Sequence, residues 1–259
     1  MHTQTTTGMT AEHYAILAER IENEFTWRRR RGRPRTLSLA GALHITLLYY
    51  RQNVTEQLIA DVVGVSQSTV SRTIAVVEAM LNVVVNDEQP DVEAALRGTT
   101  AVIDGTLLPC WSWADAPELY SGKHKTMGHN CQVLADLSGR LIHISDPIAG
   151  KHHDAHAFRE TGLADTLNLS NTLADKGYQG TGMVTPIKKQ PGEEHLPDHA
   201  KHHNRFVNTH RYVIERTIAN IKTWRIFHTD YRRPLHTFHD AFNAVRGLIF
   251  FIQKETNFA

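Results

Sequence analysis

Three carboxylates lie far apart in the sequence, but the residues around each of them are typical of a metal-binding site. Asp104 and Asp175 each end a short run of small and β-branched residues, and Glu215 is the only acid in a basic helical stretch. A buried aspartate is costly unless a donor, a cation or a metal ion pairs with it. Carboxylate oxygens are hard ligands that suit Mg²⁺ or Mn²⁺ and do not select zinc. Two such ions about 4 Å apart would support an in-line phosphoryl transfer.

The second half of the chain predicts elements that would bring these acids together. Strands are expected at 99–108, 128–136, 141–146, 172–178 and 183–188, and helices at 154–166, 198–227 and 235–254. Asp104 then lies on the first strand and Asp175 toward the end of the fourth. In a ribonuclease H-like sheet these two strands are neighbours, and sites of open α/β sheets gather at strand ends.

Basic residues accompany the acids. Arg211 and Lys222 project near the same side of their predicted helix as Glu215. We expect both to hold a nucleic-acid backbone near the metal ions. The alternative is an exposed pair of Arg211 with Glu215, which stabilises a helix only slightly. Farther upstream, Lys123 and Lys125 either contact phosphates or belong to a solvated loop.

The stretch 54–74 predicts a helix-turn-helix. Thr55 can cap one helix and Ser66 the next, and Gly64 between them can adopt the positive φ that the turn needs. The apolar positions are Leu58, Ile59, Val62, Val65, Val70 and Ile74. The outward side chains of the second helix, which suit base edges and phosphates, are Gln67, Ser68, Ser71 and Arg72. An ordinary pair of packed helices is the alternative, and we favour DNA binding.

The residues before this motif are also predicted to be helical. Thr10 can cap a helix that runs to Arg29, and Ser38 begins a second helical block. Between them, the segment 28–35 carries six arginines. This segment either lies along DNA phosphates or is an exposed connection.

Length and composition allow two domains. The chain has 259 residues, of which 41% are hydrophobic and 21% charged, as is ordinary for a globular protein. Pro90 ends the helical pattern. We therefore expect a helical DNA-binding domain over 1–90, with the helix-turn-helix at about 38–85, and a catalytic domain over 98–259.

The remaining composition favours a cytoplasmic protein. Cys110 and Cys131 match neither a zinc spacing nor a disulfide framework, and adjacent histidines such as His152 and His153 lack the spacing of a zinc site. No apolar run approaches 18 residues, and the N-terminus has no signal-peptide core. The net charge of +1 hides alternating basic and acidic patches, which suit a polyanion beside a cation-binding centre or simply solvated faces.

Taken in order, the acidic motifs resemble those of the bacterial IS5-type transposases and their eukaryotic Harbinger-like relatives, in the DDE superfamily of metal-dependent DNA endonucleases. The motifs are Ile103-Asp104-Gly105-Thr106, Ala174-Asp175-Lys176-Gly177-Tyr178 and Asn208-x-x-Arg211-x-x-x-Glu215-x-x-x-x-x-x-Lys222. The third is similar to a signature in which tyrosine is usual where Asn208 stands. The helix-turn-helix also looks like the one that such enzymes carry.

This resemblance implies an α/β, ribonuclease H-like catalytic domain with a mixed five-stranded sheet, preceded by a small all-α domain. It implies transposition of DNA, with binding of an element's terminal inverted repeats, cleavage of its ends and strand transfer to target DNA. Asp104, Asp175 and Glu215 would be the ligands of two Mg²⁺ or Mn²⁺ ions. The expected partner is double-stranded DNA, bound by a homodimer or a larger assembly at the bacterial nucleoid, with no membrane contact.

Alternatives remain at this stage. Asp154 is another candidate for the second aspartate, because relatives carry a similar Gly-x-x-His-Asp, but it begins a predicted helix and can be explained as an N-cap. We therefore prefer Asp175. Asp136 and Asp146 are most simply turn residues. The rival functions are a helix-turn-helix regulator, a nuclease for RNA–DNA hybrids and an inactive transposase that only binds DNA.

Overall fold

The structure, a computed structural model, describes residues 3–28, 34–111, 114–189, 191–192 and 195–258. The chain forms two compact units, and each is described by itself. One unit joins Met1–Gln89 with Lys222–Ala259, and the other is Pro90–Ile221. The expected division placed all of 98–259 in one domain. The structure differs from it, because the C-terminal part of that range belongs to the helical unit.

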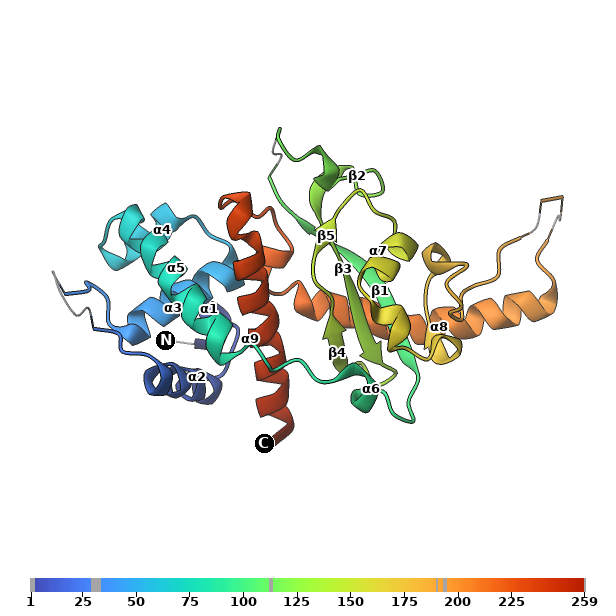
Figure 1. Cartoon of the computed structure of the whole chain (residues 1–259), viewed down its shortest axis with the longest axis horizontal. Helices are drawn as coiled ribbons and strands as arrows, with labels where there is room; N and C mark the ends of the chain where they lie inside the picture. The colour runs from blue at the N-terminus through green and yellow to red at the C-terminus, as the bar shows by residue number, and fades with distance from the viewer. Residues whose placement is uncertain (1–2, 29–33, 112–113, 190, 193–194, 259) are drawn as a thin grey trace. The chain divides into compact units, whose positions relative to one another are not determined.

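A mixed sheet forms the centre of the unit Pro90–Ile221 (Figure 1). Its strands are β1 (Ala101–Pro109), β2 (Tyr120–Ser121), β3 (Thr126–Asp136), β4 (Leu141–Ile144), β5 (Ile148–Ala149) and β6 (Thr172–Leu173). The order is β2-β3-β1-β6, and β4 and β5 also pair with β3. β3 is antiparallel to β1 and β4, whereas β6 lies parallel beside β1. The first and fourth predicted strands are therefore neighbours, as the ribonuclease H-like order requires.

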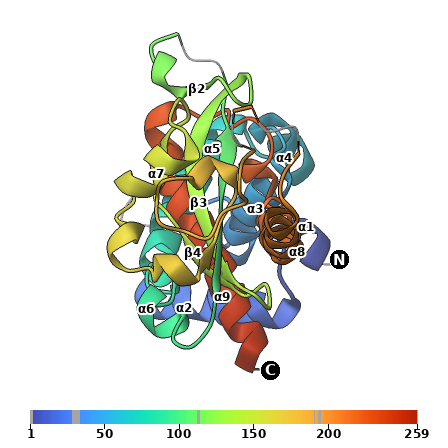
Figure 2. The ribbon, with the colours of Figure 1, turned by 90° about the vertical axis from the view of Figure 1, so that its right-hand side faces the viewer.

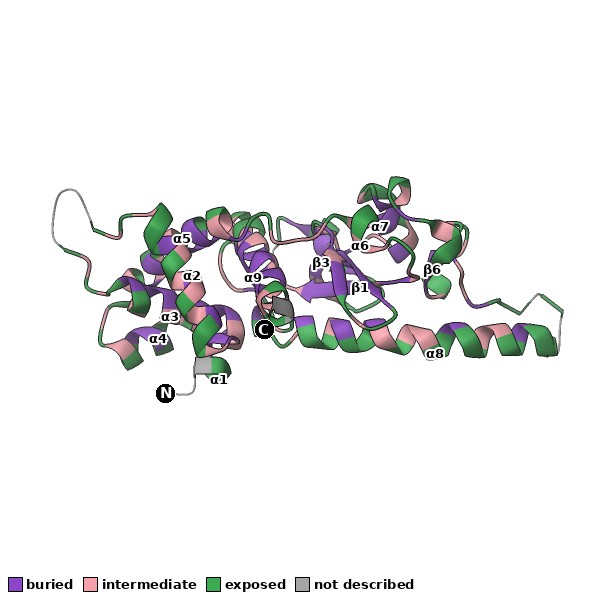
Figure 3. Ribbon diagram, turned by 90° about the horizontal axis from the view of Figure 1, so that it is seen from below, coloured by how far each residue is buried: buried purple, intermediate pink, exposed green. Residues whose placement is uncertain are grey.

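Helices cover both faces of this sheet. α7 (Asp154–Glu160) packs against β3, and α8 (Asp198–Ile221) packs against β1 and β3. Figures 2 and 3 show α7 and α8 on opposite sides of the sheet. On the α7 side an apolar core is formed by residues that include Ile103, Leu134, Ile142, Phe158 and Tyr178. The sheet is therefore buried on both faces, which leaves the ends of its strands as the places where polar side chains can gather.

The later strands are shorter than the sequence predicts. β6 stops at Leu173, and the chain turns at Asp175 into the 3₁₀ helix η4 (Lys176–Tyr178). The strand expected at 183–188 is reduced to one bridge between Leu173 and Val184. β6 therefore pairs with β1 over a short length only, and the packing of the apolar core rather than a long hydrogen-bonded ladder stabilises this edge of the sheet.

The helices of this unit also differ from their predicted bounds. The helix expected at 154–166 ends at Glu160, because Gly162 adopts φ 70° and a separate 3₁₀ turn follows. The helix expected at 198–227 ends at Ile221. The shorter elements are α6 (Val92–Ala95), η1 (Pro117–Leu119), η2 (Leu163–Asp165) and η3 (Leu169–Asn171).

The described part of the other unit is built from helices. These are α1 (Thr3–Thr7), α2 (Ala11–Glu24), α3 (Leu39–Gln52), α4 (Glu56–Val63), α5 (Gln67–Val84) and α9 (Phe238–Phe258), with 3₁₀ turns η5 (Arg225–Phe227) and η6 (Leu235–Thr237). Three predicted N-caps are confirmed, since an oxygen of each side chain accepts a backbone N–H of the first turn: Thr10, Thr55 and Ser66. Ser38, where a helical block was expected to begin, caps α3 in the same way. α2 ends at Glu24 and not at Arg29 as predicted.

The helix-turn-helix forms as predicted, but its apolar pattern is partly wrong. α4 ends at Val63, and Gly64 follows with φ 70°. Ile59, Val70 and Ile74 are buried and Val65 is half-buried, whereas Leu58 and Val62 are 50% and 71% exposed. The short helix α4 buries only the side that carries Ile59 and Ala60. Leu58 and Val62 lie one turn apart on another side of the helix, which faces solvent.

A buried ion pair ties the C-terminal segment to the helical unit. Glu78 of α5 accepts hydrogen bonds from Arg233 at 2.7 Å and from the Tyr50 hydroxyl at 2.8 Å, and it is only 3% exposed. α9 also packs along α5. These contacts are the physical reason why the segment after Ile221 departs from the predicted catalytic domain.

None of the described helices is long and apolar enough to span a membrane.

Candidate active site and nucleic-acid interface

The parallel pairing of β1 with β6 sets the centre of the candidate site. Ala101 lies opposite Thr172 and Val102 opposite Leu173. Two residues farther along each chain come Asp104 and Asp175. The same register therefore brings these two aspartates to the same level at the end of the short pairing, as the sequence predicts.

Asp104 is held in a mostly buried position. Its side chain is 16% exposed, and its Oδ2 accepts a hydrogen bond from Nη2 of Arg211 on α8 at 3.0 Å. The backbone N–H of Gly105 donates to Oδ1 at 2.9 Å. Burial raises the pKa of Asp104 to about 6, and the nearby carboxylates of Asp175 and Asp154 add to this, although Arg211 opposes it. Even with Arg211 in place, the pKa of Asp104 therefore stays above its usual value.

Asp175 is held by a local hydrogen bond. Its Oδ1 accepts the backbone N–H of Gly177 at 2.6 Å and so caps η4. The residue is only partly buried. One oxygen of this carboxylate is thus fixed while the residue stays accessible at the end of β6.

Asp154 plays a different part from the one expected of it. The N-cap of α7 is His153, whose side chain makes no capping bond, so the explanation of Asp154 as an N-cap is wrong. The Asp154 carboxylate is instead 8% exposed and pairs with Lys123 of the β2–β3 turn at 2.8 Å. Nδ2 of Asn130 on β3 donates to it at 3.4 Å. Asp154 therefore faces the inside of the sheet unit.

Two glycines make room for the Asp154 carboxylate. A Cβ atom on Gly105 would lie 2.3 Å from Oδ1 of Asp154, and one on Gly177 would lie 3.2 Å from its Oδ2 and 2.8 Å from Oδ1 of Asp175. Successive residues of a strand point to opposite faces. Asp104 therefore points toward α8, while the space beside Gly105 on the α7 face is filled by Asp154. Gly105 and Gly177 belong to the acidic motifs of Asp104 and Asp175. Each motif therefore supplies one carboxylate and, at its glycine, the space that the Asp154 carboxylate occupies.

A chain of buried polar groups supports this arrangement. Asn130 also donates to the carbonyl of His152 at 3.3 Å, and Gln132 donates to Asn130 Oδ1 at 3.3 Å. The hydroxyl of Tyr178, which follows Asp175, donates to Gln132 at 2.5 Å. Sequence reasoning missed Asn130 and Gln132. Their signal was two amides spaced by two residues inside an otherwise apolar buried strand.

Glu215 and its predicted basic partners are only partly brought together. Glu215 lies on α8 and is exposed, one helical turn from Arg211. Arg211 contacts Asp104, so the simple surface pair of Arg211 with Glu215 is not what the structure has. Nε of Arg211 is buried and has no acceptor among the described residues. Lys222 lies beyond the end of α8 and in the helical unit.

The donor set fits a divalent metal ion, although its oxygens are not gathered. Only one group of three metal-capable side chains in the described part of the chain has ligand atoms within 4.8 Å of one another, namely His152, His156 and Glu160. His156 pairs with Glu160 at 2.9 Å there, on an exposed part of α7. The aspartates of the candidate site offer oxygen ligands only, and the pKa of Asp104 is raised by burial and by the nearby carboxylates of Asp175 and Asp154. A divalent cation would stabilise the ionised form of such carboxylates.

The second helix of the helix-turn-helix presents polar side chains outward. Gln67, Ser68 and Arg72 are exposed and Ser71 is half-buried. Two contacts hold this surface in the free chain, because Gln67 donates to Glu56 at 2.5 Å and Arg72 donates to Ser68 at 3.5 Å. The predicted reading surface is therefore present on one side of α5.

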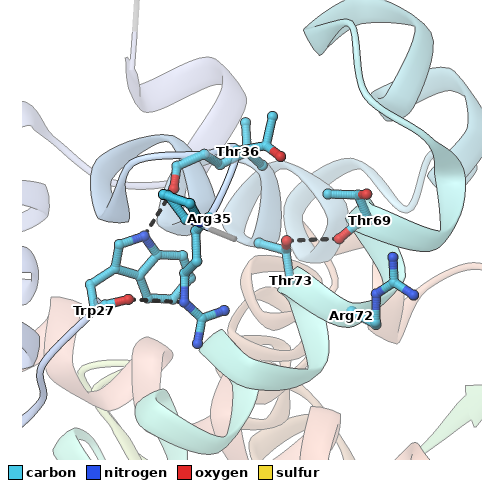
Figure 4. A pocket seen from close by; sticks show the side chains of 8 residues that line it. Trp27, Arg35, Thr36, Thr69, Arg72 and Thr73 are labelled. Atoms are coloured by element: carbon cyan, nitrogen blue, oxygen red, sulfur yellow. Dashed lines mark hydrogen bonds between the residues drawn. The ribbon is translucent and has the colours of Figure 1, made fainter. Parts of the chain in front are cut away.

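A polar pocket of about 290 Å³ lies beside this surface. Figure 4 shows Arg72 with Thr69 and Thr73 on one side of it and Trp27 with Arg35 on the other. The Arg35 guanidinium lies 4.1 Å over the Trp27 ring, and its Nε donates to the Trp27 carbonyl at 2.9 Å. Arg35 of the basic segment is thus fixed next to α5. Most of that segment, 29–33, lies outside the described residues.

Comparisons with known proteins agree with this geometry. Residues 103–248 match the family described as DDE superfamily endonuclease, and residues 35–85 match the helix-turn-helix of DDE superfamily endonuclease. The chain is similar to a protein of Streptomyces albus G named as a transposase for insertion sequence element IS112, with 31% identity over 85% of this chain and 82% of that protein. It is also similar to a protein of Microchaete diplosiphon named as a transposase for insertion sequence element IS702, with 24% identity over 93% of this chain and 90% of that protein. No solved structure matches the chain.

Proposed function

The chain belongs to the DDE superfamily of endonucleases, and we propose on this premise that it is the transposase of an insertion sequence. The enzyme cleaves DNA at the ends of the element and transfers the freed 3′-hydroxyls to target DNA. The observation that supports this proposal is the parallel pairing of β1 with β6, which Asp104 and Asp175 each follow by two residues, together with the contact of Arg211 with Asp104.

Divalent metal ions are the cofactor that membership of this family implies. We assign Mg²⁺ or Mn²⁺, because carboxylate oxygens are the only ligands at the candidate site. Asp104 and Asp175 are the shared ligands and Glu215 of α8 is the third. When bound, two such ions activate a water or a 3′-hydroxyl and stabilise the leaving oxygen.

The protein groups around the ions orient the reactants. Arg211 donates to Asp104 and so fixes the orientation of its carboxylate, and the buried Nε of Arg211 is a donor still to be satisfied. The N–H of Gly177 fixes one oxygen of Asp175. Because these groups are set before substrate arrives, little reorganisation is needed when the DNA backbone enters.

Recognition of the element belongs to the helical unit. The outward side chains of α5 read base edges in a major groove, and Arg35 and Arg72 hold the flanking phosphates. Two DNA ends must be held together for transposition, so we expect at least two copies of the chain in the active complex. Membrane partners have no role in this scheme.

A cleavage assay tests the proposal. Labelled DNA that carries the ends of the element encoding the chain is incubated with the protein and Mg²⁺, Mn²⁺ or EDTA. We expect metal-dependent nicking that is lost in Asp104→Asn, Asp175→Asn and Glu215→Gln. Asp165→Asn, an exposed carboxylate of η2, is the matched control and should cleave normally.

Two outcomes would overturn parts of this assignment. Cleavage that persists in EDTA would exclude the metal-dependent chemistry altogether. Cleavage that survives in Asp175→Asn but is lost in Asp154→Asn, with metal binding lost in the same variant, would replace Asp175 by Asp154 as the second ligand.

A further inference from the structure

One lysine lies near the carboxylates of Asp104, Asp154 and Asp175, which we call the carboxylate cluster. It is held there by Asp154, which the assigned chemistry does not use. Lys123 lies in the turn between β2 and β3, and its side chain is 51% exposed. Its ammonium lies 2.8 Å from Oδ2 of Asp154, whose side chain is 8% exposed. The partner of an exposed lysine is thus a carboxylate fixed inside the unit, which is unlike an ordinary surface ion pair.

The carboxylate of Asp154 has little freedom to move. Asn130 donates to its Oδ1 at 3.4 Å, and the backbones of Gly105 and Gly177 approach it closely. Asn130 is itself fixed by the His152 carbonyl and by Gln132. The position of the Lys123 ammonium is therefore determined by a network that reaches through β3 to Tyr178 of η4.

The charge of Lys123 acts within the same cluster as the assigned metal ligands. Burial alone would lower the pKa of Lys123, but the hydrogen bond to Asp154 and the charges of Asp154, Asp175 and Asp104 raise it above its usual value. Lys123 thus stays charged and close to all three aspartates. Because half of its side chain is exposed, it can also contact a polyanion that approaches the cluster from solvent.

We propose that Lys123 is a substrate-binding residue of the active site, which holds a phosphate of the DNA strand at the carboxylate cluster, and that Asp154 is the positioning residue that aims it there. This inference rests on the proposed function and deepens it. A lysine ammonium binds phosphate as a point charge, and one held in place loses less side-chain entropy on binding than a free one. Asp154 acts through Lys123 and is not a metal ligand.

The test compares four variants of the full-length chain with wild type in single-turnover cleavage of bound element-end DNA. These are Lys123→Ala, Lys123→Arg, Asp154→Asn and the control Lys201→Ala, an exposed lysine of α8 that pairs with the exposed Asp198. We expect Lys123→Ala to slow cleavage by roughly 10- to 100-fold, as for the loss of a charged hydrogen bond. Lys123→Arg should keep most of the rate, and Lys201→Ala should keep nearly all of it.

Two further measurements separate a phosphate contact from a structural role. The slope of log affinity for DNA against log salt should become shallower by about one in Lys123→Ala and remain unchanged in the control. Binding of Ca²⁺ to the DNA-free protein, measured by calorimetry, should be as tight as in wild type or tighter in Lys123→Ala and Asp154→Asn. The double variant should be no slower in cleavage than Lys123→Ala alone, because Asp154 acts through the lysine.

The outcomes distinguish this inference from the proposed function. If wild type neither cleaves DNA nor binds metal, the proposed function fails. If wild type does both, but Lys123→Ala cleaves like Lys201→Ala, the role of Lys123 is refuted. Loss of Ca²⁺ binding in Asp154→Asn, with normal cleavage in Lys123→Ala, would make Asp154 a metal ligand and would refute its positioning role.

Discussion

Asp136 shows how much one carboxylate can organise at the end of a strand. It ends β3 and accepts hydrogen bonds from the backbone and hydroxyl of Ser138, at 2.9 and 2.5 Å, and from Arg140. Partial burial raises the pKa of Asp136, but these hydrogen bonds outweigh it, and the pKa lies below its usual value. The sequence predicts Asp136 as a turn residue; in the structure it is the last residue of β3, and its side chain holds the turn that follows.

The lowered pKa of Asp136 makes its contribution to stability depend on pH. A carboxyl group with a lower pKa in the folded state stabilises the fold above its unfolded pKa of about 4, and loses that effect as the pH falls through the folded pKa. Asp136→Asn should therefore lower the free energy of unfolding by about 1–3 kcal/mol at pH 7, and this difference from wild type should shrink below pH 4. Urea denaturation at several pH values measures it. A difference that stays constant from pH 7 to pH 3 would contradict this account.

The close approach of Asp154 to β1 gives a second prediction at the scale of a residue. In Gly105→Ala the new methyl group would meet Oδ1 of Asp154, so the carboxylate must move away from Asn130 and Lys123. We expect the free energy of unfolding to fall by about 1–3 kcal/mol, as it does when a core is overpacked, and DNA cleavage to become slower. Gly122→Ala, where no atom lies within 4 Å of the new Cβ, is the control. A stability of Gly105→Ala equal to that of Gly122→Ala would show that the carboxylate is not confined.

At the scale of an element, the proposed DNA-binding surface joins α5 to a part of the chain far from it in sequence. Arg72 of α5 and Arg35 line the same pocket, and Arg35 is fixed over Trp27. If both arginines contact phosphates, Arg72→Ala and Arg35→Ala should each weaken binding to all DNA sequences and make the salt slope shallower by about one. Gln67→Ala should instead reduce the preference for one sequence over another.

Fluorescence anisotropy with two DNA duplexes at four salt concentrations checks this prediction. Lys254→Ala is the charge-matched control, because the ammonium of Lys254 on α9 already pairs with Glu88 at 3.0 Å. Equal salt slopes for Arg72→Ala and the control would remove Arg72 from the phosphate contacts. A sequence preference unchanged by Gln67→Ala would remove Gln67 from the reading surface.

The elements that the sequence predicted best are those decided by local chemistry. Thr10, Thr55 and Ser66 cap helices as expected, because a cap needs only its own side chain and the next turn. The exposure of Leu58 and Val62 could not be predicted in this way. Their burial depends on which neighbouring helix covers α4, and the hydrophobic period alone does not contain that information.

The candidate site was predictable to the same extent. The β-branched runs before Asp104 and Asp175, together with the strand order, were enough to expect the two aspartates at one level. The part played by Asp154 was not, because it depends on the space that Gly105 and Gly177 leave in three dimensions. An aspartate at the start of a helix has an ordinary local explanation, and only the fold shows that this explanation is wrong.

At the scale of the whole molecule, the chain crosses between its two units twice, near Pro90 and after Ile221. The sequence predicts only the first crossing, because Pro90 and the acidic residues before it interrupt a helical pattern. The second falls between a helix and a 3₁₀ turn with no change in composition. What decides it is tertiary: the ion pair of Arg233 with Glu78, whose side chains are 10% and 4% exposed, and the packing of α9 on α5.

This assignment predicts where damage to the ion pair will be felt. Glu78→Ala leaves Arg233 charged in a buried position, and such a loss typically costs about 3–5 kcal/mol. Arg233→Ala should lower the free energy of unfolding by a similar amount. The double variant should lower it by less than the sum of the two single variants, because no buried charge is then left without its partner. Lys254→Ala removes an exposed partner of Glu88 while Arg20 still pairs with that carboxylate, so it should lower the free energy of unfolding by no more than about 1 kcal/mol.

Hydrogen exchange measured by mass spectrometry gives this prediction its spatial content. In Glu78→Ala, protection should fall in peptides from both 39–84 and 238–258, because these segments form one cooperative unit. Peptides from β1 and β3 should keep the protection that they have in wild type, since the core cluster against which they pack is formed by residues of the other compact unit, Pro90–Ile221. If protection instead fell in β1 and β3 while 39–84 kept it, the C-terminal segment would be stabilising the catalytic unit. The division of the chain that we describe would then be wrong at its second crossing.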